Sequence, residues 1–282
     1  MTDGRAPTIP VMDTFCTTEL NYVSVDEPMP VACEVEIRDG RRASLPGWET
    51  CGFELVDHPS DVREWADEEE IATVHHREVE ALARAMTGCE HALVADHIKR
   101  GPDEARRHED LAPITFVHSD FAPSYIDLVR DSFRRDDNDG GRAALERNGI
   151  NADDVSAASR IVILQFWRNL GEPRMDHPIA FCDARTVRRD DARAFPVNDY
   201  AGSGFDFETL GILLPSGPER HHWYAFPDLH RDEVVAFRTF DTDLVESGAT
   251  FFTPHSAFRD PSVPLGQPAR RSIELRATCV WS

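Results

Sequence analysis

Two side chains that can bind a metal ion stand two residues apart in the stretch FVHSD. His118 offers an imidazole and Asp120 a carboxylate, with Ser119 between them. In a β-strand alternate residues lie on the same face, so the imidazole and the carboxylate would point to one side. Two histidines and one carboxylate suit ferrous iron and leave three coordination positions open for chemistry. The spacing therefore predicts two of the three protein ligands of an iron site.

The third ligand should be a histidine that a later strand brings to the same place. His255 ends the apolar segment ATFFTPH and fits this role. The adjacent His221 and His222 begin the segment HHWYAF, and one of two neighbouring residues in a strand must face inward. His255 is therefore the predicted third ligand, with one histidine of that adjacent pair as the alternative.

The segment RRSIELR is a candidate for holding the acid group of a cosubstrate. In a strand Arg270, Ser272 and Arg276 share one face. An arginine two residues before a serine can hold a carboxylate through a forked ion pair, to which the hydroxyl adds a hydrogen bond. Arg270 is the first choice for this role and Arg276 the second, whereas Arg271 should point away unless a bulge shifts the register.

The elements that would position these groups are mostly short strands. Before residue 125 the alternating or apolar segments are NYVSV, ACEVEI, HALVADHI and ITFVHSD. From residue 160 onward the strand-like segments are RIVILQFW, PIAFCD, TLGILL, HHWYAF, VVAFRTF, ATFFTPH and SIELRATCVW. Helices are expected between Pro59 and Gly88 and after Pro123. This pattern predicts a mainly β fold, a barrel or a two-sheet sandwich, with flanking helices packed outside it.

A single domain covering residues 1–282 is expected. A chain of 282 residues, 41% of them apolar, can fill one large core, and no linker or internal repeat interrupts it. Residues 1–20 lack periodicity and should form an extended N-terminal arm. The stretch RDDNDGGR, 135–142, is the predicted exposed loop. His75 and His76 stand in a helix-like context and are expected to be solvated.

Charge and cysteine content exclude several classes of partner. With 51 acidic and 30 basic residues the formal net charge is −21, which repels phosphate backbones and anionic lipid head groups. Neither a nucleic acid nor a membrane is therefore an expected partner. The six cysteines form no C-x-x-C pair, and the sequence has no long apolar run and no secretion signal. A cytoplasmic protein is expected, and the sequence leaves its oligomeric state open.

The candidate ligands and the Arg270 and Ser272 pair resemble the ligand set and the cosubstrate anchor of the ferrous, 2-oxoglutarate-dependent oxygenases. Longer blocks resemble the cephamycin 7α-hydroxylase type within that family, a group of hydroxylases and desaturases of secondary metabolism. These blocks include FVHSDFAPSY, FWRNLGEPRMDHPIAFCDARTV, and HSAFRDP followed by RRSIELR, and the likeness runs from about Gly52 to Arg276. The resemblance implies a double-stranded β-helix, the cupin-like jelly roll.

The resemblance also implies how the site would be used. Iron would be held by His118, Asp120 and His255, and 2-oxoglutarate would chelate the iron while its far carboxylate reaches Arg270. With dioxygen as the third reactant, 2-oxoglutarate would yield succinate and carbon dioxide. An unactivated C–H bond of a small-molecule intermediate would be oxidised to give an alcohol, an alkene or a ring, and the sequence does not distinguish these products.

Two residues and two rival functions complete these expectations. Trp167 and Arg168, in the block FWRN, are expected to line the substrate pocket. The first rival is a jelly-roll metalloenzyme that uses the same ligands with zinc or manganese and needs no 2-oxoglutarate. The second is a non-catalytic binding module that has kept the barrel and holds no metal.

Overall fold

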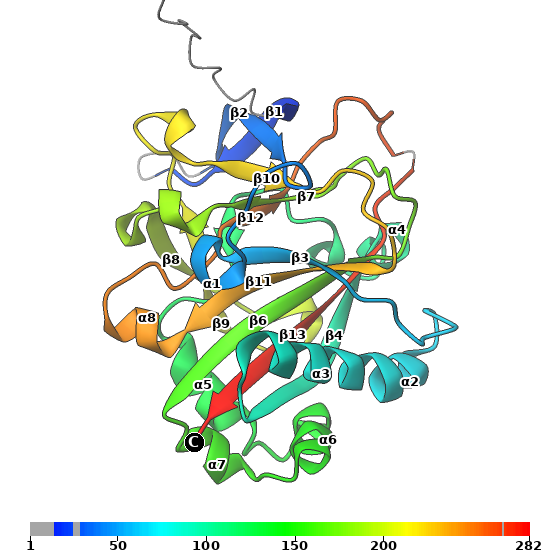
Figure 1. Cartoon of the computed structure of the whole chain (residues 1–282), viewed down its shortest axis with the longest axis vertical. Coiled ribbons are helices and arrows are strands. Elements are labelled where there is room, and N and C mark those ends of the chain that lie inside the picture. The colour runs from blue at the N-terminus through cyan, green and yellow to red at the C-terminus, as the bar shows by residue number, and fades with distance from the viewer. Residues whose placement is uncertain (1–13, 25–28, 267) are drawn as a thin grey trace, which may run out of the picture.

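Two β-sheets form the centre of the molecule (Figure 1). The structure, a computed structural model, describes residues 14–24, 29–266 and 268–282. The eight-stranded sheet has the order β1 (Thr14–Tyr22), β2 (Val31–Asp39), β10 (Trp223–Ala225), β7 (Ile179–Cys182), β12 (His255–Ala257), β5 (His118–Ser119), β9 (Phe207–Ile212) and β8 (Ala192–Val197). The five-stranded sheet has the order β3 (Phe53–Asp57), β11 (Glu233–Asp241), β6 (Arg160–Asn169), β13 (Ser272–Trp281) and β4 (His91–Arg100).

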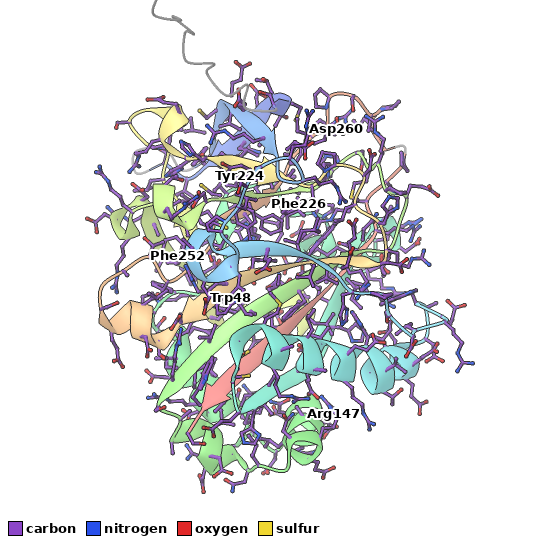
Figure 2. All side chains as sticks on the ribbon, viewed as in Figure 1. Trp48, Arg147, Tyr224, Phe226, Phe252 and Asp260 are labelled. Carbon is purple, nitrogen blue, oxygen red and sulfur yellow. The ribbon has the colours of Figure 1, made fainter. Side chains whose placement is uncertain are left out.

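Aromatic side chains fill the space between the sheets. Phe53 on β3 and Phe237 on β11 both contact Phe181 on β7 of the other sheet, at ring centroid distances of 5.5 and 4.9 Å. Figure 2 labels Tyr224 and Phe226 in the same part of the molecule, and their rings lie 6.0 and 6.1 Å from that of Phe53. Such ring pairs bury large apolar surfaces and hold the two sheets at a fixed spacing.

Helix α3 (His76–Thr87) covers the outer face of the five-stranded sheet (Figure 1). Val79 and Ala83 on this helix are fully buried and pack with residues of β6 and β13. These two strands are consequently buried on both faces, which explains their nearly continuous apolar sequences. The helix ends at Gly88, whose φ of 68° lies in the left-handed region that glycine adopts without strain.

The remaining helices are short and surround the sheets. They are α1 (Trp48–Cys51), α2 (Glu68–Glu70), a π-helical segment (Ile71–His75), α4 (Pro102–Ala105), α5 (Tyr125–Ser132), α6 (Asp139–Asn148), α7 (Ala152–Ser156) and α8 (Thr242–Glu246). Single 3₁₀ turns occupy Glu109–Leu111, Ala184–Thr186, Arg189–Asp191, Tyr200–Gly202 and Pro218–Arg220. Among the described residues, no helix is both long and apolar enough to span a bilayer.

Two predicted strands are shorter than expected. Only His255 of the segment ATFFTPH lies in a strand, because Pro254 has no N–H to donate and the preceding Phe251 and Phe252 are buried in the core. Only residues 118–119 of ITFVHSD form a strand. Of the expected N-terminal arm, residues 1–13 lie outside the described residues, and residues 14–20 belong to β1, which pairs antiparallel with β2.

The predicted loop 135–142 is wrong in its second half, because α6 begins at Asp139. Asn138 caps this helix by accepting a hydrogen bond from the Gly141 N–H at 2.8 Å. A Cβ atom at Gly140 would clash with the carbonyl oxygen of Ala95, so glycine at this position lets α6 approach β4. The glycines that suggested a loop therefore serve close packing.

The expectation that His75 and His76 are solvated is wrong. Their exposed fractions are 1% and 4%. His75 Nδ1 lies 3.0 Å from a carboxylate oxygen of Glu78, and His76 Nε2 lies 3.0 Å from Nδ1 of His97. Each histidine therefore has a polar partner at one ring nitrogen, and both are buried where the π-helical segment passes into α3.

Candidate metal centre

Two neighbouring strands bring the predicted ligands together. His118 begins β5 and His255 begins β12, and these two residues are direct partners in the antiparallel pair. Their ring centroids are 4.3 Å apart. Asp120 follows β5 on the same face as His118, and the ligand atoms of the three residues all lie within 4.8 Å of one another. All three side chains are buried.

Backbone carbonyls fix the tautomer of both imidazoles. His118 Nδ1 donates to the carbonyl oxygen of Phe116 at 2.8 Å, and His255 Nδ1 donates to that of Thr253 at 3.1 Å. A carbonyl oxygen can only accept, so each Nε2 carries a lone pair. These Nε2 atoms lie 3.8 and 3.5 Å from Oδ1 of Asp120. Three lone-pair donors therefore face one another, an arrangement that fits a divalent cation.

The ionisation of the cluster also suits a metal ion. Burial lowers the pKa of His118 to about 3, and the neighbouring His255 contributes to this lowering. Burial alone would raise the pKa of Asp120, but the Arg276 guanidinium and the two imidazoles outweigh it and hold that pKa well below its usual range. The imidazole of His118 is therefore neutral and the carboxylate ionised near neutral pH, as metal ligands must be.

A glycine supports the segment that leads into His255. The Thr253 hydroxyl donates to the carbonyl oxygen of Gly52 at 2.9 Å, and the carbonyl group of Thr253 is the one that orients the His255 ring. Gly52 has a φ of 95°, and a Cβ atom there would clash with the Thr253 hydroxyl. The backbone near α1 and the position of one metal ligand are therefore linked through two hydrogen bonds.

The three ligands line a buried cavity between the sheets. The other residues around this cavity are Arg100, Ile114, Gln165, Ile179, Ala257, Arg270 and Glu274. The imidazoles come from the eight-stranded sheet, whereas Gln165 and Glu274 come from β6 and β13 of the five-stranded sheet. The polar groups of the site therefore face one another across the interior of the barrel.

Arg270 is a buried cation without an acidic partner. It is 4% exposed, its Nε donates to the Ser272 hydroxyl at 3.1 Å, and its guanidinium lies 5.0 Å from the ring centroid of Trp167. Among the residues that the structure describes, no carboxylate forms an ion pair with this guanidinium. Burial lowers the pKa of Arg270 to about 9, because Glu274 compensates the charge only in part. Such a group favours an incoming anion.

The other charges of the cavity are paired. Arg276 donates from Nε to Oδ2 of Asp120 at 3.1 Å, and its Nη2 forms an ion pair with the same oxygen, also at 3.1 Å. Arg100 lies 2.9 Å from Glu274 and also donates to the Tyr200 hydroxyl at 2.7 Å. The charges within each of these two ion pairs cancel. Because Arg270 has no such partner, the metal-free cavity carries one uncompensated positive charge.

Gln165 adds an unpaired polar group. Its Oε1 is buried and has no hydrogen-bond partner in the described part of the chain. The sequence carried a signal for this residue, since it is the polar member of the otherwise apolar run RIVILQFW. Arg100 and Gln165 were both absent from the predicted site, and Arg100 gave no signal because it ends a strand in a charged stretch.

The structure separates several candidates from the metal ligands. His221 contacts the Tyr22 hydroxyl at 3.3 Å and Asp191 at 3.5 Å, and His222 does not join the ligand cluster either. Arg271 lies at the surface, 2.9 Å from Asp103. The rival third ligand and the third arginine therefore lie away from the cavity.

Trp167 and Arg168 point to different places. Trp167 forms part of the wall of a second cavity, whose lining includes the apolar Met175, Phe226 and Leu229 and the charged Arg174, Asp228 and Asp260. Ile179 lines both cavities, so the second adjoins the one that holds the metal ligands.

Arg168 instead donates to the carbonyl oxygen and to Nδ1 of His58, both at 2.8 Å. Its guanidinium also lies 5.6 Å from the ring centroid of Trp65, a residue of the cluster beneath α3. The guanidinium is therefore not part of the lining of either of these two cavities.

Comparison with known proteins identifies a family. A family model described as an oxidoreductase/YMDC permease-like domain matches residues 14–280. The hydroxylase/desaturase efuI of Hormonema carpetanum is 30% identical over 250 residues, which cover 82% of this chain and 77% of that protein. The Fe(II)/2-oxoglutarate-dependent dioxygenase nvfI of Aspergillus novofumigatus is 28% identical over 201 residues, which cover 70% and 63% of the two chains.

Solved structures agree on the fold. A variant of the iron and alpha-ketoglutarate-dependent endoperoxidase NvfI superposes with a TM-score of 0.74 at 20% identity, covering 100% of this chain and 99% of that one. The predicted double-stranded β-helix is thereby confirmed. Together with the family match, these relatives show that the chain belongs to the Fe(II)/2-oxoglutarate-dependent oxygenases, among relatives that include hydroxylases and desaturases.

Proposed function

We propose that this protein uses ferrous iron, 2-oxoglutarate and dioxygen to oxidise an unactivated C–H bond of a small-molecule intermediate in secondary metabolism. One observation carries the proposal. The cavity that holds His118, Asp120 and His255 also holds Arg270, a buried cation with no carboxylate partner among the described residues. A zinc or manganese enzyme without a cosubstrate would have no use for that cation.

The residues divide into two groups by role. His118, Asp120 and His255 would hold the iron, and Arg270 with the Ser272 hydroxyl would bind the far carboxylate of 2-oxoglutarate. When bound, iron and 2-oxoglutarate would allow dioxygen to act as the oxidant that removes a hydrogen atom from the substrate, with succinate and carbon dioxide as coproducts. A dianion suits the charge of the site, since Arg270 contributes one uncompensated positive charge and a ferrous ion two more.

The second cavity is the proposed substrate site. Trp167, Met175, Phe226 and Leu229 give it a mainly apolar wall, and it adjoins the first cavity at Ile179. Arg174, Asp228 and Asp260 also line it, so the cavity favours a molecule with a largely apolar body and some polar groups. The blocks FVHSDFAPSY and FWRNLGEPRMDHPIAFCDARTV support a narrower assignment to the cephamycin 7α-hydroxylase type.

We also propose a cytoplasmic location and a single domain. All six cysteines are free thiols, which is usual in a reducing compartment. The single family model that spans residues 14–280 supports one unit.

The test combines spectroscopy with product analysis. Anaerobic addition of ferrous iron and 2-oxoglutarate should give a weak visible charge-transfer band, and His118→Ala and His255→Ala should each abolish it. His221→Ala is the matched control, because it removes the rival histidine and should keep the band. Zinc at full occupancy, no band with iron, and no succinate under turnover would contradict the proposal and favour the cosubstrate-free metalloenzyme.

A further inference from the structure

We infer that Arg276 is a positioning residue that turns Asp120 so that this carboxylate binds metal through Oδ1 alone. The inference rests on the proposed metal site and assigns Arg276 a role other than that of the cosubstrate anchor. The supporting observation is that the two carboxylate oxygens of Asp120 contact different groups.

Two nitrogens of the Arg276 guanidinium contact the same oxygen atom. Its Nε and Nη2 lie 3.1 Å from Oδ2 of Asp120. The other oxygen, Oδ1, lies 3.8 Å from Nε2 of His118 and 3.5 Å from Nε2 of His255. One carboxylate oxygen is therefore occupied by the guanidinium, and the other faces the imidazoles.

The guanidinium is itself fixed from several sides. Arg276 lies on β13 opposite Gln165 of β6, in the middle of the five-stranded sheet. Its Cζ atom is 5.4 Å from the ring centroid of Phe121, and its Nη2 is 4.0 Å from Glu274. A planar group held in this way on a strand can fix the rotation of the carboxylate that it contacts.

The division of the oxygens determines how many metal positions remain free. An unrestrained carboxylate can bind a metal through both oxygens and would then occupy a second position. Two histidines and one carboxylate oxygen leave three positions, which a bidentate cosubstrate and dioxygen together require. By holding Oδ2, Arg276 preserves the third open position.

The same geometry separates Arg270, which lies just before β13, from Arg276 on that strand. Arg276 is committed to Asp120 through one hydrogen bond from Nε and one ion-pair contact from Nη2. Arg270 has no carboxylate partner in the described residues, and its only side-chain bond there is to the Ser272 hydroxyl. Arg270 is thus available to an incoming anion, while Arg276 serves a residue of the protein.

The experiment measures metal binding in the absence of 2-oxoglutarate and of turnover. Cobalt(II) is the probe, added to the full chain, and both its affinity and its visible d–d spectrum are recorded. Arg276→Gln should weaken cobalt binding about 10- to 100-fold, as loss of a partner of a metal ligand typically does, and should change the spectrum. The cobalt affinity of Arg276→Lys should lie between those of the unaltered chain and of Arg276→Gln, because an ammonium supplies the charge without the planar fork.

The control and the opposing outcomes follow from the same titration. Arg271→Gln, at the surface beside Asp103, should bind cobalt as the unaltered chain does, whereas Arg270→Gln should keep the cobalt site and fail to bind added 2-oxoglutarate. Unchanged cobalt affinity and spectrum in a folded Arg276→Gln variant would overturn the inference. If that variant does not fold, unchanged affinity and spectrum in Arg276→Lys would do so.

Failure of the proposed function has a different signature. In that case the unaltered chain would bind cobalt but neither bind 2-oxoglutarate nor form succinate. A weakened cobalt site in Arg276→Gln would still support the role of Arg276, since the cobalt measurement requires no cosubstrate.

Discussion

Replacing Arg270 with methionine should improve the stability of the ligand-free protein and abolish cosubstrate binding. Methionine keeps most of the side-chain length and removes the charge. Arg270 is 4% exposed and forms no ion pair among the described residues, so the folded chain carries an unfavourable buried cation until an anion arrives. A variant that gains stability but loses affinity for its ligand indicates that the original side chain is retained for binding.

The structure sets the size of each effect. Burial lowers the pKa of Arg270 from 12.5 to about 9, and at about 1.4 kcal/mol per pH unit this amounts to several kcal/mol of unfavourable burial. Loss of the contact with the Trp167 ring, 5.0 Å away, and of the bond to Ser272 offsets part of the gain. A net stabilisation of about 1 to 2 kcal/mol is expected, which raises Tm by roughly 2 to 4 °C. Loss of a charge-assisted pair to a carboxylate should weaken 2-oxoglutarate by about 2 to 4 kcal/mol, a factor of roughly 30 to 1000.

Two assays check both signs. Thermal unfolding of the metal-free chain measures the stability change, and anaerobic titration of the metal-loaded chain with 2-oxoglutarate measures the affinity. Arg271→Met is the matched control, since Arg271 is a surface residue paired with Asp103 and its removal should change stability by at most about 0.5 kcal/mol. A variant that binds 2-oxoglutarate normally, or whose Tm falls by several degrees, would refute the reasoning.

Three further changes test the surroundings of the site. Gly52→Ala should cost about 2 kcal/mol or more of folding free energy in a denaturation assay, and it should weaken metal binding because the added Cβ clashes near a metal ligand. Gly88→Ala is the control, since Gly88 has a φ of 68° and no neighbour within 4 Å of an added Cβ. This variant should cost only about 1 kcal/mol in the same assay. Arg168→Met should lower the free energy of unfolding by about 2 to 4 kcal/mol and leave metal and 2-oxoglutarate affinities unchanged; a selective loss of either affinity would return this residue to the site. Burial lowers the pKa of His76 to about 3, below the 6.5 of an unfolded chain, so the unfolded state binds the proton first and stability is lost as pH falls from about 6.5 toward 3. His76→Gln should reduce that dependence in urea midpoints measured across this window by the share of one histidine, since His118 contributes in the same range, while His91→Gln, on the partly exposed start of β4, should leave it in place.

The ligand residues were accessible to sequence reasoning because each depends on a local pattern. His118 and Asp120 follow from the two-residue period of a strand, and His255 follows from its place after an apolar run. Their convergence depends on the pairing of β5 with β12, segments more than 130 residues apart. No local pattern encodes such a pairing.

The errors have identifiable physical causes. Pro254 and the buried Phe251 and Phe252 gave an apolar run that packs as irregular chain rather than as a strand. Two adjacent glycines suggested a loop, but Gly140 lets α6 approach β4 and Gly141 lies against the Asn138 side chain that caps the helix. In each case the local conformation was inferred from residue types, although tertiary contacts determine that conformation.

The sequence alone could not distinguish the roles of Arg270 and Arg276, for a related reason. Both residues share one face of the strand predicted for RRSIELR, and strand alternation treats them alike. The structure separates them through their partners, because Arg276 contacts Asp120 whereas Arg270 contacts a serine hydroxyl and an aromatic ring. Whether a buried arginine has a carboxylate partner depends on what the opposite sheet presents.

The division of the site between two sheets gives cosubstrate binding a structural consequence. The imidazoles belong to the eight-stranded sheet, while Arg270 leads into β13 of the five-stranded sheet. A metal ion alone needs groups from the first sheet, whereas 2-oxoglutarate held by the metal and by Arg270 would connect both. The free energy of cosubstrate binding then acts on the packing of one sheet against the other, because a ligand that binds only the folded arrangement stabilises it in proportion to its affinity. Arg276 and Asp120 already make one such connection within the protein, at the carboxylate that the metal requires.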